Sequence, residues 1–173
     1  EATPLERLTF APAALNAIAG EIDNLRAAAD WCVAGDRPDL LARLATRLFC
    51  FWWLGGFHQE GRRRLLDALR DGERLSPDER VACHAVLAVV TTIQLEREFS
   101  VEHANRAIDL AAGRPSPFLV IALVLRAFGI SILGALPGAD PRFALDALRD
   151  VGAAVEMAAS GLVDFQGHSK SHS

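Results

Sequence analysis

Start and stop signals for helices recur at short intervals along this chain and divide it into segments of helical length. The clearest start is Ser76-Pro77, where the serine can cap a helix, the proline suits its first position and Glu79 can complete a capping box. The other signals are Pro12, Gly35, Pro38, Gly55-Gly56, Gly72, Ser100, Gly113, Ser116-Pro117, Gly134, Asp140-Pro141 and Gly161. Between these signals, no stretch of five residues alternates apolar with polar side chains. The sequence therefore predicts an all-α fold with about seven helices.

The predicted helices fall into pairs because the loops between them are short, and short loops make consecutive helices antiparallel neighbours. The three pairs are 38–54 with 57–71, 77–97 with 100–112, and 117–134 with 141–160. The second helix of each pair repeats a small-residue pattern around Ala68, Ala107 and Ala154. Two helices approach closely only where the facing side chains are small, so we expect these alanines at helix–helix contacts.

Composition agrees with helices and excludes several kinds of enzyme. Alanine and leucine supply 30 and 24 of the 173 residues, and 51% of the chain is hydrophobic, which is enough for a packed core. The chain has 17 arginines but a single lysine, Lys170. The residues before it therefore contain neither a P-loop lysine nor a Schiff-base lysine. A net charge of −4 gives no general preference for nucleic acid. No catalytic motif is present, and we expect a protein that is not an enzyme and holds no cofactor.

The cysteines, the histidines and the most apolar segment of the chain are each expected to have structural roles. The three cysteines are widely spaced, as expected for reduced, buried residues of a cytoplasmic protein: Cys32, Cys50 and Cys83. The histidines form no metal-ligand pair on one helix, which predicts no metal site: His58, His84 and His103. Residues 118–136 are nearly all apolar, but Arg126 lies near their centre and two glycines interrupt them. These interruptions favour a packed helix over a membrane span.

Two segments resemble a known family. Residues 21–31, EIDNLRAAADW, are similar to the E-x-D-N-L-R-A-A-x-x-W helix of large bacterial ATPase-type transcriptional regulators. Residues 51–63, FWWLGGFHQEGRR, resemble the F-W-x-x-x-G-x-x-x-E-G-R-x-x-L hairpin that opens the tetratricopeptide-like region of those proteins. Such regulators carry an ATPase part, then helical repeats, and often a LuxR-type helix-turn-helix. The two motifs together span residues 21–69, and residues 75–160 resemble the family only as degenerate repeats.

The resemblance implies antiparallel helical hairpins stacked as a tetratricopeptide-like right-handed array. It also implies a protein-interaction and signal-sensing domain of a multidomain bacterial transcriptional regulator. The partners would be the ATPase and DNA-binding parts of the same regulator, or a protein or small effector. No phosphate loop or recognition helix occurs in the chain, so direct nucleic-acid binding does not carry over, and no membrane partner is expected. The matching motif residues are expected to be structural: Asp23, Asn24, Arg26, Trp31, Glu60 and Gly61.

Seven side chains are candidates for binding a partner or effector: Trp52, Trp53, His58, Arg62, Arg63, Arg47 and Arg126. Adjacent tryptophans lie about 100° apart on a helix. One is therefore expected in the core, and the other either at a helix–helix contact or exposed as an anchor. The arginines at 62–64 form either a solvated face that pairs with Glu60 and Asp67 or a patch that docks an acidic partner surface or a phosphate. Arg47 and Arg126 lie in apolar helices, either in internal salt bridges or lining a groove for an anionic ligand.

The chain divides into three parts. Residues 1–35 are predicted to be a linker and first helix that join an upstream domain, residues 36–161 three degenerate helical-hairpin repeats, and residues 162–173 a polar tail or cloning remnant. Since the chain starts at Glu1 rather than at methionine, we expect a fragment of a longer protein. Two other functions stay open: a scaffold for homo-oligomers, and a small-molecule-binding or catalytic bundle around Arg47 and Arg126.

Overall fold

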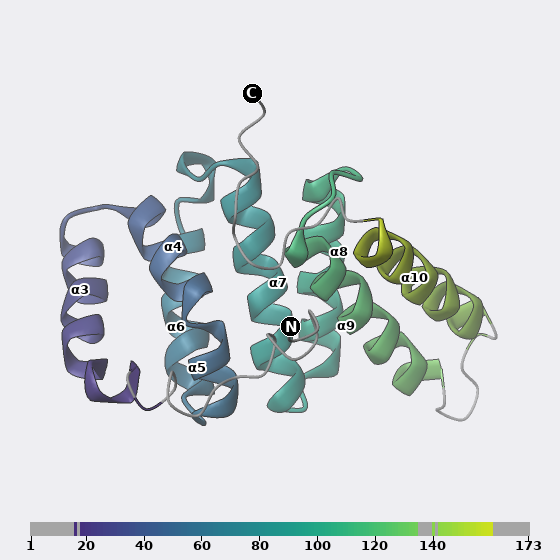
Figure 1. The fold of residues 1–173 in the computed structure, drawn as a ribbon, viewed down its shortest axis with the longest axis horizontal. Helices are drawn as coiled ribbons and strands as arrows, with labels where there is room; N and C mark the ends of the chain where they lie inside the picture. Colours follow the sequence, from purple (N-terminus) through teal and green to yellow (C-terminus); the bar gives the residue numbers. More distant parts are fainter. Residues whose placement is uncertain (1–15, 17, 135–139, 141, 161–173) are drawn as a thin grey trace, which may run out of the picture.

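The computed structural model describes residues 16, 18–134, 140 and 142–160, and every regular element among them is a helix. The elements are α3 (Ile22–Ala34), α4 (Pro38–Arg47), α5 (Phe49–Leu54), α6 (His58–Leu69), the 3₁₀ turn η1 (Gly72–Arg74), α7 (Pro77–Ile93), α8 (Arg97–Ala111), α9 (Pro117–Gly134) and α10 (Arg142–Ala159). Consecutive α-helices pack against one another in a row that runs from α3 at one end to α10 at the other (Figure 1). The prediction of an all-α fold is confirmed for these residues. The predicted start at Pro12, most of the loop at 134–138, the stop at Gly161 and the tail at 162–173 lie outside them.

Three helix starts carry the caps that the sequence predicts. The Oγ of Ser76 accepts from the backbone N–H of Glu79 at 3.2 Å, and the carboxylate of Glu79 accepts from the backbone N–H of Ser76 at 3.0 Å. This reciprocal pair is a capping box, with Pro77 at the first helical position. Ser116 and Asp140 likewise accept from backbone N–H groups in the first turns of α9 and α10, at 3.1 and 2.9 Å. The N-terminal donors of a helix, which lack partners inside it, are satisfied in part by these side chains.

The predicted helix at 38–54 is broken in two at Leu48, where the backbone leaves the helical conformation with ψ near 9°. The break leaves the carbonyl of Ala45 to accept a hydrogen bond of 2.9 Å from the indole Nε1 of Trp52. A buried indole N–H needs a partner. The tryptophan that the apolar pattern places in the core is therefore satisfied by an irregularity that the pattern does not show.

The prediction that Ser100 caps a helix is wrong. The chain turns at Leu95, whose φ is +60°, and α8 begins at Arg97, so Ser100 lies inside that helix and is buried. Its Oγ donates to the carbonyl of Ala88 at 2.9 Å and lies 2.6 Å from the Oγ1 of Thr92. The serine thus joins α8 to α7 instead of ending a loop.

The core forms two clusters, and α7 contributes to both. Cys83, Val86, Leu87 and Val90 face the cluster shared with α3 to α6. Val81 and Ala85, on another face of the same helix, belong to the cluster shared with α8, α9 and α10. Helices α4, α5, α6, α8 and α9 all pack against α7. Every residue from Val81 to Thr91 is buried, as expected for a helix that lies at the centre of a protein.

Small residues occur where neighbouring helices approach most closely. Ala68, Ala107 and Ala154, which share a pattern in the sequence, are all buried, with at most 3% of their surface exposed. Gly61 of α6 packs directly on Trp52, and a Cβ built on Gly61 would lie 2.5 Å from the indole Cγ. The three alanines are buried in the core, as expected for residues at helix–helix contacts, and Gly61 lies in close contact with Trp52.

The most apolar helix, α9, lies between α8 and α10 in the row (Figure 1). Its buried residues include Leu119, Ala122 and Leu123, which pack in the second cluster. Within the described ranges, no helix has both the length and the apolar character that crossing a bilayer requires.

We predict that Gly61→Ala destabilises the protein. The added methyl would overlap the indole of Trp52, and overpacking of this kind costs about 1–3 kcal/mol, more than the gain of about 1 kcal/mol in helix propensity. Thermal unfolding followed by circular dichroism should show a lower midpoint. The control is Gly20→Ala, because Gly20 is also helical and a Cβ there meets nothing within 4 Å. A Gly61→Ala protein as stable as its Gly20→Ala counterpart would contradict the close contact.

Candidate functional site

The residues that carry the family resemblance join α3 to α6. Arg26 of α3 makes a bidentate contact with Glu60 of α6, with Nε and Nη2 lying 2.8–3.1 Å from the carboxylate oxygens. The hydrogen bonds from Arg26 hold the pKa of Glu60 below its usual value. Arg64, whose side chain is only 6% exposed, donates from Nη1 to Asp30 at 2.5 Å. These two bridges tie α3 to α6, which lies later in the chain.

The other motif residues of α3 lie on the surface. Asp23 is 3.4 Å from Arg26, and the amide of Asn24 donates to Glu21 at 2.6 Å. Trp31 is 61% exposed, which is unusual for so large an apolar side chain. The fully buried residues of α3 are small, Ala29 and Cys32, and Ile22 and Leu25 pack beside them against the core.

The adjacent tryptophans separate as the helical geometry predicts. Trp52 is buried at 3% exposure, whereas Trp53 is 40% exposed at the surface. The imidazole Nε2 of His58 lies 3.0 Å from the carbonyl oxygen of Trp53, so this histidine contacts the backbone at the turn between α5 and α6. Whether Trp53 and His58 bind a partner stays a prediction.

The three arginines at 62–64 point in different directions, and their partners are not the ones that neighbouring sequence suggests. Arg62 reaches α8, where it pairs with Glu96 at 2.7 Å and lies over the ring of Phe99 at 4.7 Å. Arg64 reaches α3, and Arg63 is exposed. The expected partners, Glu60 and Asp67, pair with Arg26 and Arg70. The run therefore connects three helices and is not a single basic patch.

Arg47 and Arg126 have different surroundings and do not form one site. Arg47 is exposed at the end of α4, beside a hollow of about 390 Å³ that α7 and the start of α9 also line. Arg126 of α9 makes a bidentate salt bridge of 2.5 and 2.6 Å with Asp150 of α10 and donates to Asn105 of α8 at 3.3 Å. The Asp150 carboxylate is 5% exposed. Of the two interpretations of Arg126, the internal salt bridge is the one observed.

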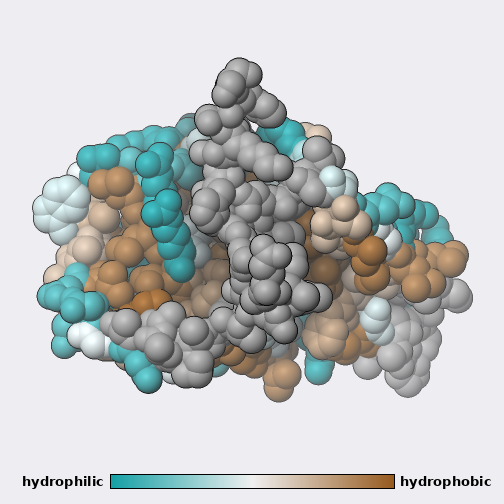
Figure 2. Space-filling model, viewed as in Figure 1, coloured by the Kyte–Doolittle hydropathy of each residue, from teal (hydrophilic) through white to brown (hydrophobic). Residues whose placement is uncertain are grey.

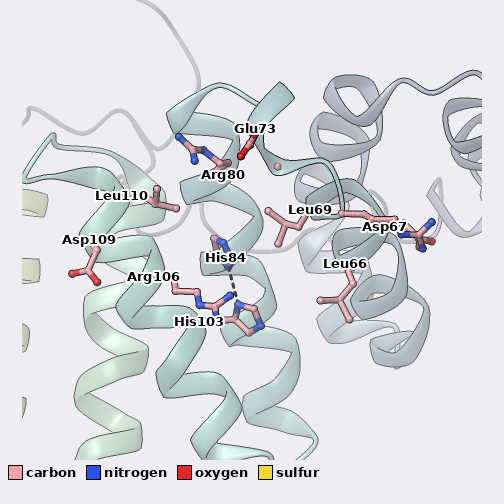
Figure 3. A pocket seen from close by; sticks show the side chains of 12 residues that line it. Leu66, Asp67, Leu69, Glu73, Arg80, His84, His103, Arg106, Asp109 and Leu110 are labelled. Carbon is pink, nitrogen blue, oxygen red and sulfur yellow. Dashed lines mark hydrogen bonds and ion pairs between the residues drawn. The ribbon is translucent and has the colours of Figure 1, made fainter.

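A groove of about 740 Å³ runs across α6, α7 and α8. We call it the histidine groove; Figure 3 shows its lining residues, among them Leu66, Leu69, Arg80, His84, His103, Arg106 and Leu110. The leucines form apolar walls, and His84 of α7 and His103 of α8 point toward each other between them (Figure 3). A lining that combines apolar walls with a few polar side chains is typical of a binding cleft.

The two histidines form a buried hydrogen-bonded pair, with their Nδ1 atoms 2.7 Å apart. Their rings stack at 5.0 Å, and Phe99 packs edge-on against His103 at 4.4 Å. Burial lowers the pKa of both imidazoles to about 4, and the facing arginines, Arg106 above all for His103, act in the same direction. Both rings are therefore neutral at pH 7. One Nδ1 donates to the other, so the pair keeps one Nε2 acceptor and one Nε2–H donor.

Arginines also line the groove around the histidines, and in the described part of the chain one of them has a buried donor without a hydrogen-bond partner. Arg106 pairs with Glu102 at 2.7 Å, and Arg70 pairs with Asp67 at 2.6 Å. The buried Nε of Arg80 has no hydrogen-bond partner among the residues that the structure describes. A buried donor without a partner carries a free-energy cost.

Sequence reasoning missed this groove because its residues come from three helices. His84 and His103 are 19 residues apart, and only the packing of α7 on α8 brings them together. The sequence does contain a signal that both histidines are buried. His84 and His103 each lie one helical turn before a buried alanine, Ala88 and Ala107. Across the described residues, no three His, Cys, Asp or Glu side chains gather in a way that would hold a metal ion.

The comparisons with known proteins add no relative. No family model, no curated protein and no solved structure matches the chain.

We predict that Asp150→Asn destabilises the fold by about 3 kcal/mol, because it leaves the half-buried Arg126 without its charge partner. Chemical denaturation measures the loss. The matched control is Asp146→Asn, which removes an exposed pair with Arg149 and should cost less than about 1 kcal/mol. Equal losses in the two variants would contradict the internal role of Asp150.

We further predict that acid weakens the fold through the histidine pair. In the unfolded chain an imidazole has a pKa near 6.5, whereas in the folded protein both pKa values are about 4. Below about pH 6.5 the unfolded state therefore binds more protons, and the free energy of unfolding falls by a few kcal/mol as the pH decreases toward 4. Denaturation at a series of pH values measures this slope.

The double variant His84→Leu/His103→Leu removes both partners of the hydrogen bond and should flatten the slope between pH 6.5 and 4. The control His58→Asn should keep it, because His58 lies outside the pair. An unchanged slope in the double variant would show that other groups cause the acid sensitivity.

Proposed function

We propose that this chain is a non-enzymatic protein-interaction and signal-sensing domain of a multidomain bacterial transcriptional regulator, and that its helices form a tetratricopeptide-like right-handed array. In this proposal the histidine groove binds an effector or a segment of a partner, and the domain acts in the cytoplasm with the rest of the regulator. Ligand binding would shift the regulator between two states by its different affinity for each.

The observation that carries the binding role is the histidine groove itself. It spans three successive helices, as the ligand surfaces of stacked helical repeats do. Its leucine walls suit an apolar ligand body, while Arg80, Arg106 and the imidazole edges suit an acceptor group, such as a carboxylate or carbonyl oxygen. A ligand with both features would use the apolar area for affinity and the polar groups for orientation.

Support for the regulator comes from the motif at residues 21–69. Its signature residues are structurally coupled: Arg26 binds Glu60, and Gly61 packs on Trp52. Substitution of any one of these residues would disturb its partner. Such mutual dependence gives a physical reason for the residues of the motif to occur together.

Of the two other functions, the catalytic or ligand-binding bundle around Arg47 and Arg126 has the weaker support, because the two side chains lie in different surroundings and Arg126 is occupied by Asp150. The oligomerisation scaffold is favoured by a separate surface, the face of α10 on which Leu145, Leu148 and Val155 are exposed.

Binding in the groove is testable with the fluorescent probe 1-anilinonaphthalene-8-sulfonate, an aromatic anion that matches both sides of the groove. We predict saturable binding, weakened about tenfold by Arg106→Ala, since a hydrogen bond to a charged group contributes about 1.5–3 kcal/mol. Leu66→Asp should weaken it as well by placing a charge on the apolar wall. Fluorescence titration gives the dissociation constants.

The control is Arg149→Ala. Arg149, like Arg106, is an exposed helical arginine paired with a carboxylate one turn away, but it lies on α10 outside the groove. Its substitution should leave the titration unchanged. Binding that is absent, or equally affected by the Arg106 and Arg149 substitutions, would contradict the groove as the ligand site.

The regulator context has its own test in the reading frame that encodes this chain. The proposal expects a phosphate-binding loop upstream and a helix-turn-helix downstream in the same frame. A frame with neither would contradict the regulator, whatever the probe binds.

A further inference from the structure

The outer face of α10 carries a continuous row of exposed residues at heptad spacing. The row is Leu145, Leu148, Gly152, Val155 and Ala159, with intervals of three, four, three and four residues, and we call it the α10 seam. Leu145, Leu148 and Val155 are 62%, 70% and 60% exposed. Alternation of three and four is the spacing with which one helix packs along another in a coiled coil.

The opposite face of α10 is already used inside the protein. Ala147 and Ala154 are buried, and the carboxylate of Asp150 is held by Arg126 of α9. These contacts fix the rotation of α10, so the seam points away from the core. In the part of the chain that the structure describes, α10 is the last helix of the row and packs against α9, and the described helices before it leave the seam exposed (Figure 1). Apolar side chains are visible at this end of the molecule in Figure 2.

The seam is complementary to itself when two copies of α10 run antiparallel. A two-fold axis near residue 150 places Leu148 of each copy over Gly152 of the other, and Leu145 against Val155. Space exists for the leucine, since a Cβ built on Gly152 meets nothing within 4 Å. Large residues thus meet small ones across the axis, which is the condition for close helix packing.

The residues beside the seam favour the same arrangement. On one side, Arg142, which is 82% exposed and pairs with Asp140 at 2.9 Å, would also lie near Glu156 of the other copy. On the other side, the two copies of Val151 would meet at the axis and add apolar contact. The two Arg149 side chains would also come near the axis, each neutralised by its own Asp146 at 3.0 Å. A parallel pair would instead place Gly152 against Gly152 and leave each leucine facing its own copy.

We propose that this chain forms a two-fold symmetric dimer through antiparallel pairing of α10 with α10 of a second copy. The interface is isologous, so it closes on itself and stops at two chains. The proposal is independent of the regulator function and of the histidine groove, which lies on α6, α7 and α8.

Sedimentation velocity from the low to the high micromolar range tests the dimer. The expected result is a mass that rises toward twice the 18.7 kDa of one chain. Leu148→Glu and Val155→Glu should each raise the dissociation constant of the dimer at least about tenfold, because each places a charge in an apolar contact. Since both side chains are exposed, the circular dichroism spectrum and the melting midpoint measured on the monomer should stay unchanged.

The matched control is Val124→Glu on α9, which charges an apolar residue of 47% exposure outside the seam and should leave the dimer intact. A wild-type chain that stays monomeric at high micromolar concentration would overturn the proposal. So would a dimer that tolerates both seam substitutions, or one that only the control substitution disrupts.

Orientation is tested by oxidative cross-linking of variants that each add one cysteine, and the wild-type chain, with its three native cysteines, gives the background. Val151→Cys should form a disulfide across the axis, whereas Val155→Cys should not, because it faces Leu145 of the other copy. The reverse pattern would indicate a parallel pair and contradict the antiparallel dimer.

Discussion

Burial of α7 on all sides is the constraint on which the rest of this structure depends. Its residues from Val81 to Thr91 are all buried, and both hydrophobic clusters draw on them. Each Val or Leu fully removed from water contributes about 1.5–3 kcal/mol, so this one helix accounts for a large share of the apolar driving force. Its carbonyls accept the buried hydroxyls at this contact: Thr91 donates to the carbonyl of Leu87 at 2.7 Å, and Ser100 of α8 donates to that of Ala88. The helices on either side are thereby organised around a shared centre.

The features that suggest function depend on that arrangement. His84 is on α7, and it meets His103 because Ser100, Ala104 and Ala107 allow α8 to approach α7 closely. The floor of the histidine groove is therefore part of the packing between two helices, which makes it rigid and suitable for a ligand that must be recognised by shape. At the two ends of the row the situation differs. Helices α3 and α10 each have one packed side, held by Arg64–Asp30 and Arg126–Asp150, and one side that remains exposed. The groove and the α10 seam are thus separate surfaces with separate physical origins.

Local sequence signals predicted local structure well, and tertiary contacts explain what they missed. The capping box at Ser76 and Glu79 was predictable because its partners are three residues apart. Ser100 carries a similar signal, but its hydroxyl found the carbonyl of Ala88, twelve residues away. Likewise, Arg64 has acidic neighbours in sequence and pairs instead with Asp30, 34 residues away. The all-α fold, the paired helices and the buried alanines depend on periodicity and are therefore predictable. The histidine pair and the arginine bridges depend on which helices are neighbours in space, and the pattern of a single sequence does not reveal those neighbours.

Native-state hydrogen exchange is the most direct test of the claim that α7 is the shared centre. If both clusters depend on it, the amides of Val81 to Thr91 should exchange only through global unfolding, and their opening free energies should equal the free energy of unfolding measured by denaturation. Amides of α3 and α10, which pack on one side, should open at lower free energy. The account would be contradicted if the α7 amides exchanged through a partial opening while α9 or α4 stayed protected, because the two clusters would then be held together by something other than α7.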